Sequence, residues 1–112
     1  MTMPERVWFI TGAGRGLGLA TARAALEAGH KVVAAARRPD AAEEALGDLP
    51  GAAENLLAER LDVTRAEDAR LAVNAALNRF GRIDVLVNAA GYGQIGAFEA
   101  NTPEEVARQF DV

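Results

Sequence analysis

The chain contains no cysteine and no serine, and it has one lysine, one histidine and one tyrosine. The absence of cysteine excludes disulfides and thiolate metal sites, and it is typical of a reducing compartment. No apolar run approaches the roughly 20 residues that a membrane-spanning helix needs. The first residues also lack the charge pattern and the apolar length of a signal peptide. We therefore expect a soluble, cytoplasmic protein without a membrane partner.

The charged residues do not favour nucleic acid as a partner. The chain has 112 residues and a formal net charge of −4, and its arginines are scattered along the sequence rather than gathered in a stripe. Nucleic-acid binding normally requires a concentrated basic face. Half of the residues are hydrophobic, which is enough for one small core.

A glycine-rich stretch, residues 11–18, follows an apolar run and opens into an alanine-rich segment. We interpret the run as a buried strand and the segment as a helix. The start of a helix presents unpaired N–H groups and the positive end of its dipole, and glycines let an anion approach the backbone there. The stretch therefore predicts a site for the pyrophosphate of a dinucleotide, formed by Gly12, Gly14, Arg15, Gly16, Leu17 and Gly18.

The spacing of these glycines separates the stretch from other phosphate-binding loops. The common G-x-G-x-x-G fingerprint would need a glycine at position 17 or 19, and both are leucine. The stretch reads T-G-x-x-x-G-x-G instead. No Gly-Lys-Ser/Thr follows, which excludes a nucleoside-triphosphate loop. The alternative interpretation is a tight turn in which the glycines serve geometry alone.

Apolar runs recur at regular intervals along the chain, with helical segments between them, and this alternation is typical of βα units. The predicted strands are residues 6–11, 31–36, 56–61 and 83–88. Glu59 and Arg60 suit a strand at the edge of a sheet. We therefore predict an α/β fold, a doubly wound parallel sheet of the Rossmann type, with strand order 3-2-1-4 and the fourth strand at the other edge.

Capping patterns predict where the helices begin and end. Gly29 and Gly81 are placed as left-handed caps after two helices. A capping residue three positions before a glutamate predicts three helix starts, and Pro103 suits the first position of the last of these helices. The three pairs are Asp40 with Glu43, Thr64 with Glu67, and Thr102 with Glu105.

Four sequence motifs, which are named below in chain order, make the chain resemble the short-chain dehydrogenase/reductase family from Val7 to Val112. The resemblance implies an NAD(P)-binding Rossmann domain over residues 1–112. It also implies hydride transfer to or from a small carbonyl or alcohol substrate, and a homo-oligomer when the enzyme is complete. The motifs are the glycine stretch, Leu61-Asp62-Val63-Thr64, Asn88-Ala89-Ala90-Gly91 and Phe110-Asp111-Val112.

The resemblance also assigns roles to residues after the third and fourth strands. Asp62 would contact the adenine, and Val63 would line the adenine pocket. Asp62 could instead cap a helix, although Thr64 is the better cap. The stretch Asn88, Ala89, Ala90 and Gly91 would lie beneath the cofactor, shape its site and steady the sheet. For Ala89 and Ala90, a plain turn at the end of a strand is the alternative.

The end of the second strand predicts which dinucleotide binds. An acidic side chain there would bind the ribose hydroxyls of NAD, but this chain has Arg37 and Arg38 after Ala36. An arginine suits a phosphate because its planar fork can bind two oxygens. With Arg15 as a further cation, these residues favour NADP over NAD. The alternative is that both arginines are solvated loop charges.

The catalytic residues that the resemblance implies have no counterpart in the chain. The family uses a tyrosine, a lysine four residues later, and a serine. Here Tyr92 is followed four residues later by Gly96, and the lone lysine is Lys31. We therefore expect a cofactor-binding half, truncated before the catalytic half and inactive alone. A dinucleotide-binding module without catalysis and a non-functional truncation product are the alternatives.

The predicted sheet order has a consequence for the behaviour of the chain. If the fourth strand lies at an edge, its backbone groups and the apolar side of the segment around Val106 and Phe110 are left bare. A long exposed apolar edge invites pairing with another chain. We therefore expect the chain alone to aggregate or to need a partner.

Overall fold

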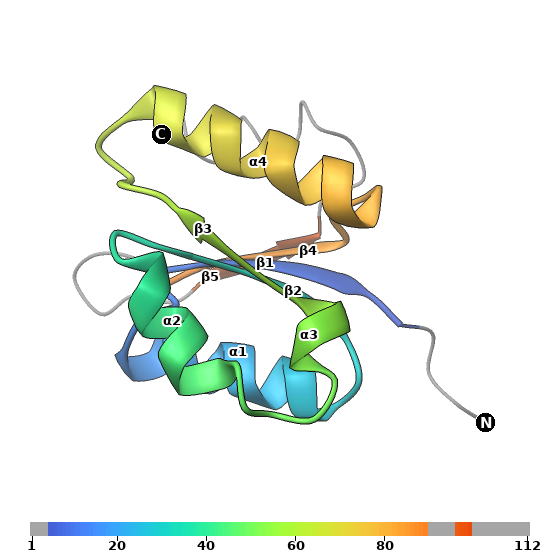
Figure 1. Ribbon diagram of the computed structural model, residues 1–112. Helices are drawn as coiled ribbons and strands as arrows, with labels where there is room; N and C mark the ends of the chain where they lie inside the picture. Colours follow the sequence, from blue (N-terminus) through green and yellow to red (C-terminus); the bar gives the residue numbers. More distant parts are fainter. Residues whose placement is uncertain (1–4, 90–95, 100–112) are drawn as a thin grey trace.

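The computed structural model describes residues 5–89 and the backbone of residues 96–99. It contains one sheet between layers of helices (Figure 1). The elements in chain order are β1 (Val7–Thr11), α1 (Gly16–Glu27), β2 (Lys31–Ala36), α2 (Pro39–Leu46), α3 (Ala52–Asn55), β3 (Leu56–Arg60), α4 (Ala66–Phe80), β4 (Val85–Asn88) and β5 (Gly96–Glu99).

The sheet has the strand order β3-β2-β1-β4-β5. The pairs β1–β2, β1–β4 and β2–β3 are all parallel. The predicted α/β fold and the order 3-2-1-4 of its first four strands are therefore confirmed, as is the edge position of β3. Because β1 lies in the middle, the chain changes direction across the sheet between β3 and β4, as in a Rossmann-type fold.

The expectation that β4 forms the second edge is wrong. β5 pairs with β4 in antiparallel orientation, with Gly96 beside Asn88 and Glu99 beside Val85. The strand that follows β4 most closely in the sequence thus supplies the hydrogen-bond partner that an edge strand lacks. This removes the argument that a bare β4 edge would make the chain aggregate. The segment around Val106 and Phe110 lies outside the described residues.

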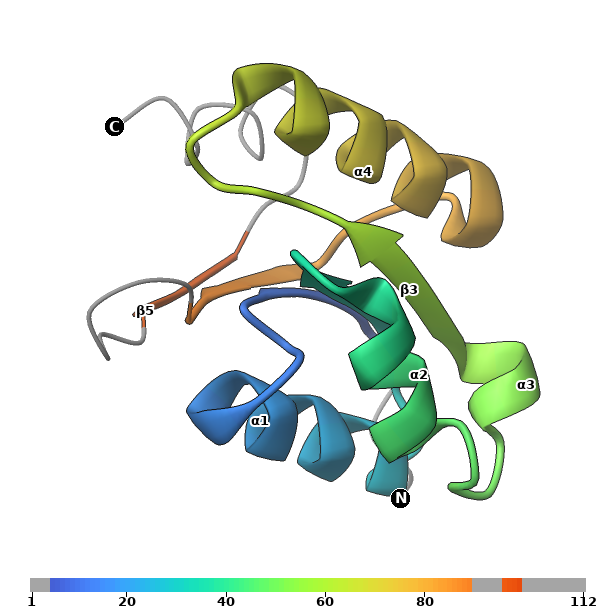
Figure 2. The same ribbon diagram turned by 60° about the vertical axis from the view of Figure 1, so that its left-hand side comes forward.

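Helices cover both faces of the sheet. α4 lies on one face, and α1, α2 and α3 lie on the other (Figures 1 and 2). Successive strand residues point to opposite faces: Phe9 belongs to the core cluster on the α4 side, and Ile10 to the cluster on the α1 side. All five residues from Val32 to Ala36 are buried. This is the pattern expected for a strand that is covered on both faces.

The glycines predicted to end two helices do so. Gly29 follows α1 with φ of 91°, and Gly81 caps α4 with φ of 83°. In this left-handed region a side chain would be strained, and glycine is not. Each glycine reverses the chain into the loop that leads to the next strand.

Two predicted helix starts are wrong. α2 begins at Pro39 rather than after Asp40, because the fixed φ of proline suits the first helical position. α4 begins at Ala66 after Arg65, and the Thr64 hydroxyl donates to the Asp62 carboxylate in the preceding turn instead of capping the helix. The third predicted start, at Thr102 and Pro103, lies outside the described residues.

In the part of the chain that the structure describes, none of the helices has the length and the apolar character needed to cross a bilayer.

Candidate functional site

The loops that follow β1, β2 and β3 and the end of β4 lie together, because these four strands are parallel (Figure 2). They occupy the edge of the sheet that is formed by the carboxyl ends of the strands. Most of the residues predicted to bind a cofactor lie there. Residues 12–18 follow β1, residues 37–38 follow β2, residues 62–63 follow β3, and residues 88–89 end or follow β4. Ala90, Gly91 and Tyr92 lie outside the described residues. In open α/β sheets, ligands bind at this edge, beside the strand where the chain changes direction.

The loop after β1 requires glycine at two positions. Gly12 has φ of 64° and Gly16 has φ of 59°, both in the left-handed region. The N–H of Ala13 donates to the carbonyl of Ala35, at 3.1 Å, and joins the loop to β2. A Cβ on Gly16 would meet no atom within 4 Å. The backbone at Gly16 therefore faces open space.

Gly18 is required for a different reason, the close approach of backbone to backbone. A Cβ at this position would lie 2.1 Å from the carbonyl oxygen of Gly12, which is far inside van der Waals contact. α1 can therefore pack against the loop only with glycine at position 18. A Cβ on Gly14 would lie 3.5 Å from the Cβ of Ala36, an ordinary contact. Sterically, position 14 would accept a small side chain.

The amino terminus of α1 is suited to an anion. The first hydrogen bond of the helix runs from the N–H of Leu19 to the carbonyl of Arg15, at 3.2 Å. The N–H groups of Gly16, Leu17 and Gly18 come earlier and have no acceptor within the helix. No acidic residue occupies the first turn, and no side chain caps it. These N–H groups and the positive end of the helix dipole favour a phosphate.

Thr11 connects the glycine loop to the end of β4. Its buried hydroxyl donates to Oδ1 of Asn88, at 2.9 Å, and accepts from the N–H of Ala89, at 3.1 Å. The hydroxyl thereby holds the start of the segment that was predicted to shape the cofactor site. Thr11 was not predicted as a site residue, although a polar residue at the end of an apolar strand was the available signal.

Asp62 closes a turn after β3. Its Oδ1 accepts from the hydroxyl of Thr64, at 2.7 Å, and from the N–H of Thr64, at 3.0 Å. These hydrogen bonds hold the pKa of Asp62 below its usual value, and the positive charges of Arg37 and Arg65 lower it further. Asp62 is therefore ionised at neutral pH, and Val63 beside it is an exposed apolar side chain.

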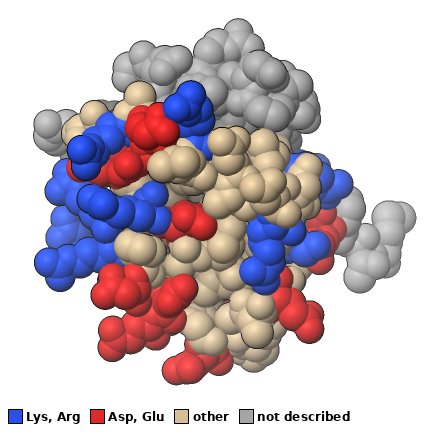
Figure 3. Space-filling view, turned by 45° about the horizontal axis from the view of Figure 1, so that its top comes forward, with Lys and Arg blue, Asp and Glu red and all other residues tan. Residues whose placement is uncertain are grey.

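Basic side chains gather at this edge. Arg15, Arg37 and Arg38 are all exposed. Figure 3 shows a group of basic side chains on its left, the side on which β1, β2 and β3 end in Figure 1, with acidic side chains below them. Ala36, the last residue of β2, is buried, and its Cβ faces Gly14. β2 thus ends in an alanine rather than an acidic residue, and two exposed arginines follow it.

The sequence matches the family model described as short chain dehydrogenase over residues 6–112. The curated relatives include several uncharacterized oxidoreductases, and this chain spans between 31% and 45% of their length. Over the matched segment, the chain is 38% identical to an uncharacterized oxidoreductase of Bacillus subtilis and covers 31% of that protein.

Two solved structures extend the comparison. A short-chain dehydrogenase from Streptomyces avermitilis has a TM-score of 0.72 and 42% identity, with 94% of this chain and 38% of that chain covered. An alcohol dehydrogenase from Thermococcus sibiricus, complexed with 5-hydroxy-NADP, has a TM-score of 0.67 and 35% identity, with 74% and 36% covered. Two further solved structures that are similar to this chain contain NADH in one case and NAD in the other.

Proposed function

Because the chain belongs to the short-chain dehydrogenase family, we propose that it is the dinucleotide-binding half of an NADP(H)-dependent oxidoreductase. The complete enzyme would reduce a ketone or oxidise a secondary alcohol, and the bound cofactor would accept or supply the hydride. The observation that supports this most is the free amino terminus of α1 beside Gly12 and Gly16, which both have positive φ. An anion-binding helix start at the carboxyl edge of a parallel sheet fits the pyrophosphate of a dinucleotide.

Each part of the dinucleotide has candidate residues at this edge. The N–H groups of residues 16–18 would hold the pyrophosphate. Asp62 would accept a hydrogen bond from the adenine amino group, because its low pKa keeps it ionised and an ionised carboxylate only accepts. Val63 would cover one face of the adenine with its exposed side chain. Asn88 and Ala89, held by Thr11, would lie under the cofactor together with Ala90 and Gly91, the next two residues in sequence.

The preference for NADP rests on the end of β2. The 2′-phosphate of NADP carries negative charge, and Arg37 would bind it together with Arg38 or Arg15. Ala36 pairs with Arg60 in the register of β2 with β3, so Arg37 follows β2 beside the point where β3 ends. Position 36 holds alanine instead of an acidic residue, which would repel the phosphate. This combination supports NADP more than NAD.

We also propose that these residues bind the cofactor without turnover. A proton must reach or leave the substrate oxygen as hydride moves, and positioned acid–base groups typically accelerate such steps by about 10²- to 10⁴-fold. The sequence holds no serine and no tyrosine followed four residues later by lysine. The substrate, the proton relay and the homo-oligomer therefore belong to the complete enzyme.

The test of cofactor choice is the double variant Ala36→Asp with Arg37→Ala. The new carboxylate would bind the ribose hydroxyls and repel the 2′-phosphate, and one charge-assisted hydrogen bond to the phosphate would be lost. Such bonds contribute about 1.5–3 kcal/mol, so the ratio of NADP to NAD affinity should fall at least about tenfold in a calorimetric titration.

The matched control is Ala24→Asp with Arg23→Ala. It makes the same two substitutions at exposed positions on α1 and changes the net charge equally. The control should keep the affinity ratio of the unmodified chain. An unchanged ratio in the Ala36 and Arg37 variant, or an equal change in both variants, would reject the assignment of Arg37.

A further inference from the structure

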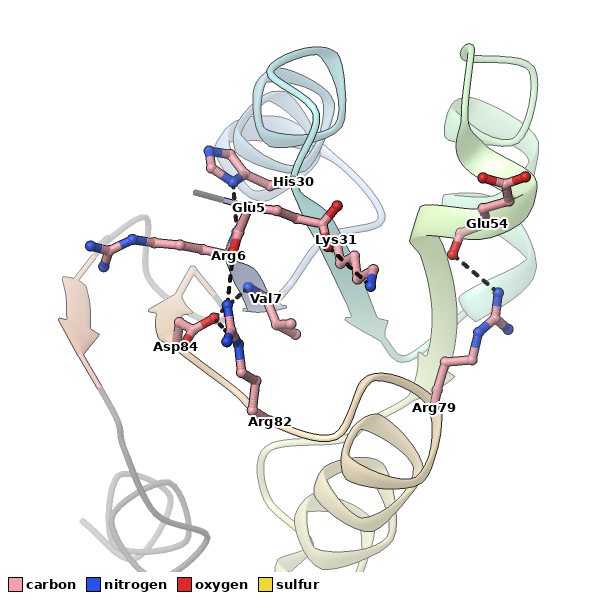
Figure 4. A network of polar contacts seen from close by, with 9 residues as sticks. All are labelled: Glu5, Arg6, Val7, His30, Lys31, Glu54, Arg79, Arg82 and Asp84. Carbon is pink, nitrogen blue, oxygen red and sulfur yellow. Dashed lines mark hydrogen bonds and ion pairs between the residues drawn. The ribbon is translucent and has the colours of Figure 1, made fainter. Parts of the chain in front are cut away.

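The opposite edge of the sheet, where the parallel strands begin, carries a second network of polar contacts (Figure 4). Two backbone N–H groups at the start of β1 donate to side chains instead of to a neighbouring strand. The N–H of Arg6 donates to Nδ1 of His30, at 3.0 Å, and the N–H of Val7 donates to Oδ2 of Asp84, at 2.8 Å. The start of the central strand is thus held from both sides.

His30 and Asp84 complete the pairing of β1 where the strands on either side begin. The carbonyl of Arg6 accepts from the N–H of Lys31, at 3.0 Å, and the carbonyl of Val7 accepts from the N–H of Asp84, at 2.9 Å. The β1–β2 register starts only with Val7 beside Lys31. The imidazole of His30 therefore serves as the acceptor that a further β2 residue would otherwise provide.

The direction of the first contact fixes the state of the imidazole. Because the N–H of Arg6 is a donor, Nδ1 must carry a lone pair, so the ring is neutral with its proton on Nε2. In the imidazolium ion both nitrogens are donors, and Nδ1 would then face another donor. Histidine is the side chain that ordinarily gains this charge between pH 8 and pH 5.

We propose that the contact between His30 Nδ1 and the N–H of Arg6 is a pH-sensitive latch, which releases the start of β1 from β2 when His30 is protonated. We call this contact the His30 latch. The contact on the other side is made by the carboxylate of Asp84, which pairs with the guanidinium of Arg82 at 2.9 Å, and carboxylates ordinarily keep their charge over this range. Release is therefore confined to the β2 side.

Among the described residues, charged groups around the latch come from several elements. Lys31 pairs with Glu5, at 3.0 Å, and Nη2 of Arg82 donates to the carbonyl of Glu5, at 2.8 Å. Glu27 ends α1, close to His30 in sequence. The Arg6 side chain extends from the segment that leads into β1 (Figure 4). The backbone of Glu99 lies in the register row of Trp8 and Val85. Among the side-chain types in this set, histidine is the one whose charge ordinarily changes between pH 8 and pH 5.

The fluorescence of Trp8 can report the protonation of His30. Trp8 is the single tryptophan, and its ring lies 5.8 Å from the ring of His30, the single histidine, at an interplanar angle of 40°. We expect an imidazolium to quench indole fluorescence more strongly than a neutral imidazole does, because its positive charge is attracted to the face of the electron-rich ring. Protonation of His30 should therefore lower the emission of Trp8.

The test compares the 112-residue chain with His30→Asn, whose amide oxygen can accept from Arg6 as Nδ1 does but does not titrate. At pH 7.5, imidazole ¹⁵N shifts should show Nδ1 without a proton. Between pH 7.5 and 5.5 the protection factor of the Arg6 amide should fall about 2- to 13-fold, the range that corresponds to one hydrogen bond of about 0.5–1.5 kcal/mol. Trp8 emission should fall in parallel.

In His30→Asn, the Arg6 protection factor should stay constant over this range, and in His30→Ala it should be low at every pH. The amide of Val7, held by Asp84, is the internal control and should keep its protection. A proton on Nδ1 at pH 7.5, or an Arg6 protection factor that does not depend on pH, would overturn the proposal. An Arg6 protection factor that falls equally with pH in the unmodified chain and in His30→Asn would overturn it too. Global unfolding at low pH would give this result, because it does not depend on His30.

Discussion

The glycines of the loop after β1 are required for different physical reasons. Gly18 is needed for packing, since a Cβ would lie 2.1 Å from a backbone oxygen. Gly16 is needed for its positive φ and leaves open space at the start of α1. A substitution at Gly18 therefore tests the fold, whereas a substitution at Gly16 tests the ligand site.

We predict that Gly16→Val abolishes saturable cofactor binding while the chain remains folded. The valine side chain would occupy the open space at the anion-binding helix start, and the positive φ would cost about 1–2 kcal/mol of stability. Calorimetric titration with NADPH measures the first effect, and denaturant unfolding measures the second.

Gly29→Val is the matched control for that strain. Gly29 also has positive φ, and a Cβ on it would meet no atom within 4 Å, but it lies at the other end of α1. Its variant should lose comparable stability and keep its affinity for NADPH. Near-normal affinity in Gly16→Val would mean that the glycine serves only the geometry of the turn.

The glycine loop and the arginines could be predicted from the sequence because the signal is local. The loop lies between a strand and a helix, and the residues that follow a strand are known once the strand is known. The role of Thr11 could not be predicted in this way. Its partners Asn88 and Ala89 are more than 70 residues away, and only the pairing of β1 with β4 brings them together.

At the scale of elements, Thr11 makes the contact between β1 and β4 that reaches the candidate site. We predict that Thr11→Val lowers the free energy of unfolding by about 1–3 kcal/mol, because the variant leaves the N–H of Ala89 and the amide of Asn88 without their partner in a partly buried place. Affinity for the cofactor should fall as well. Denaturant unfolding and calorimetry measure the two effects.

Thr21→Val is the control for removing a hydroxyl. The Thr21 hydroxyl donates to the carbonyl of Leu17 within α1, in an exposed contact. Its loss should change stability by no more than about 0.5 kcal/mol. If Thr11→Val behaved like Thr21→Val, the link between β1 and β4 would contribute little to the site.

Strands with a strong apolar pattern were predicted correctly, and β5, which lacks one, was not. The four parallel strands are apolar and regularly spaced, so their existence and order follow from pattern and connection rules. β5 has only four residues, one of them glycine, and its pairing depends on the free edge of β4 rather than on its own pattern. The helix starts shifted because Pro39 and the Asp62–Thr64 turn act on the backbone more strongly than the capping pattern does.

At the scale of the whole molecule, the two edges of the sheet differ in chemistry. The edge where β1, β2 and β3 end carries glycines with positive φ, a free helix start and exposed arginines. The edge where they begin carries ion pairs and the His30 latch, which hold the start of β1. The proposed binding function thus belongs to one edge, and the other secures the strand that supports it.

The most direct test of the proposed function is a calorimetric titration of the 112-residue chain with NADPH and, separately, with NADH. The proposal predicts saturable binding of NADPH, with one site per chain, and weaker binding of NADH, because the 2′-phosphate adds contacts with Arg37 and its neighbours. Binding of neither dinucleotide by a chain that is folded by circular dichroism would contradict the proposal. The glycine loop would then be a turn between a strand and a helix, and no more.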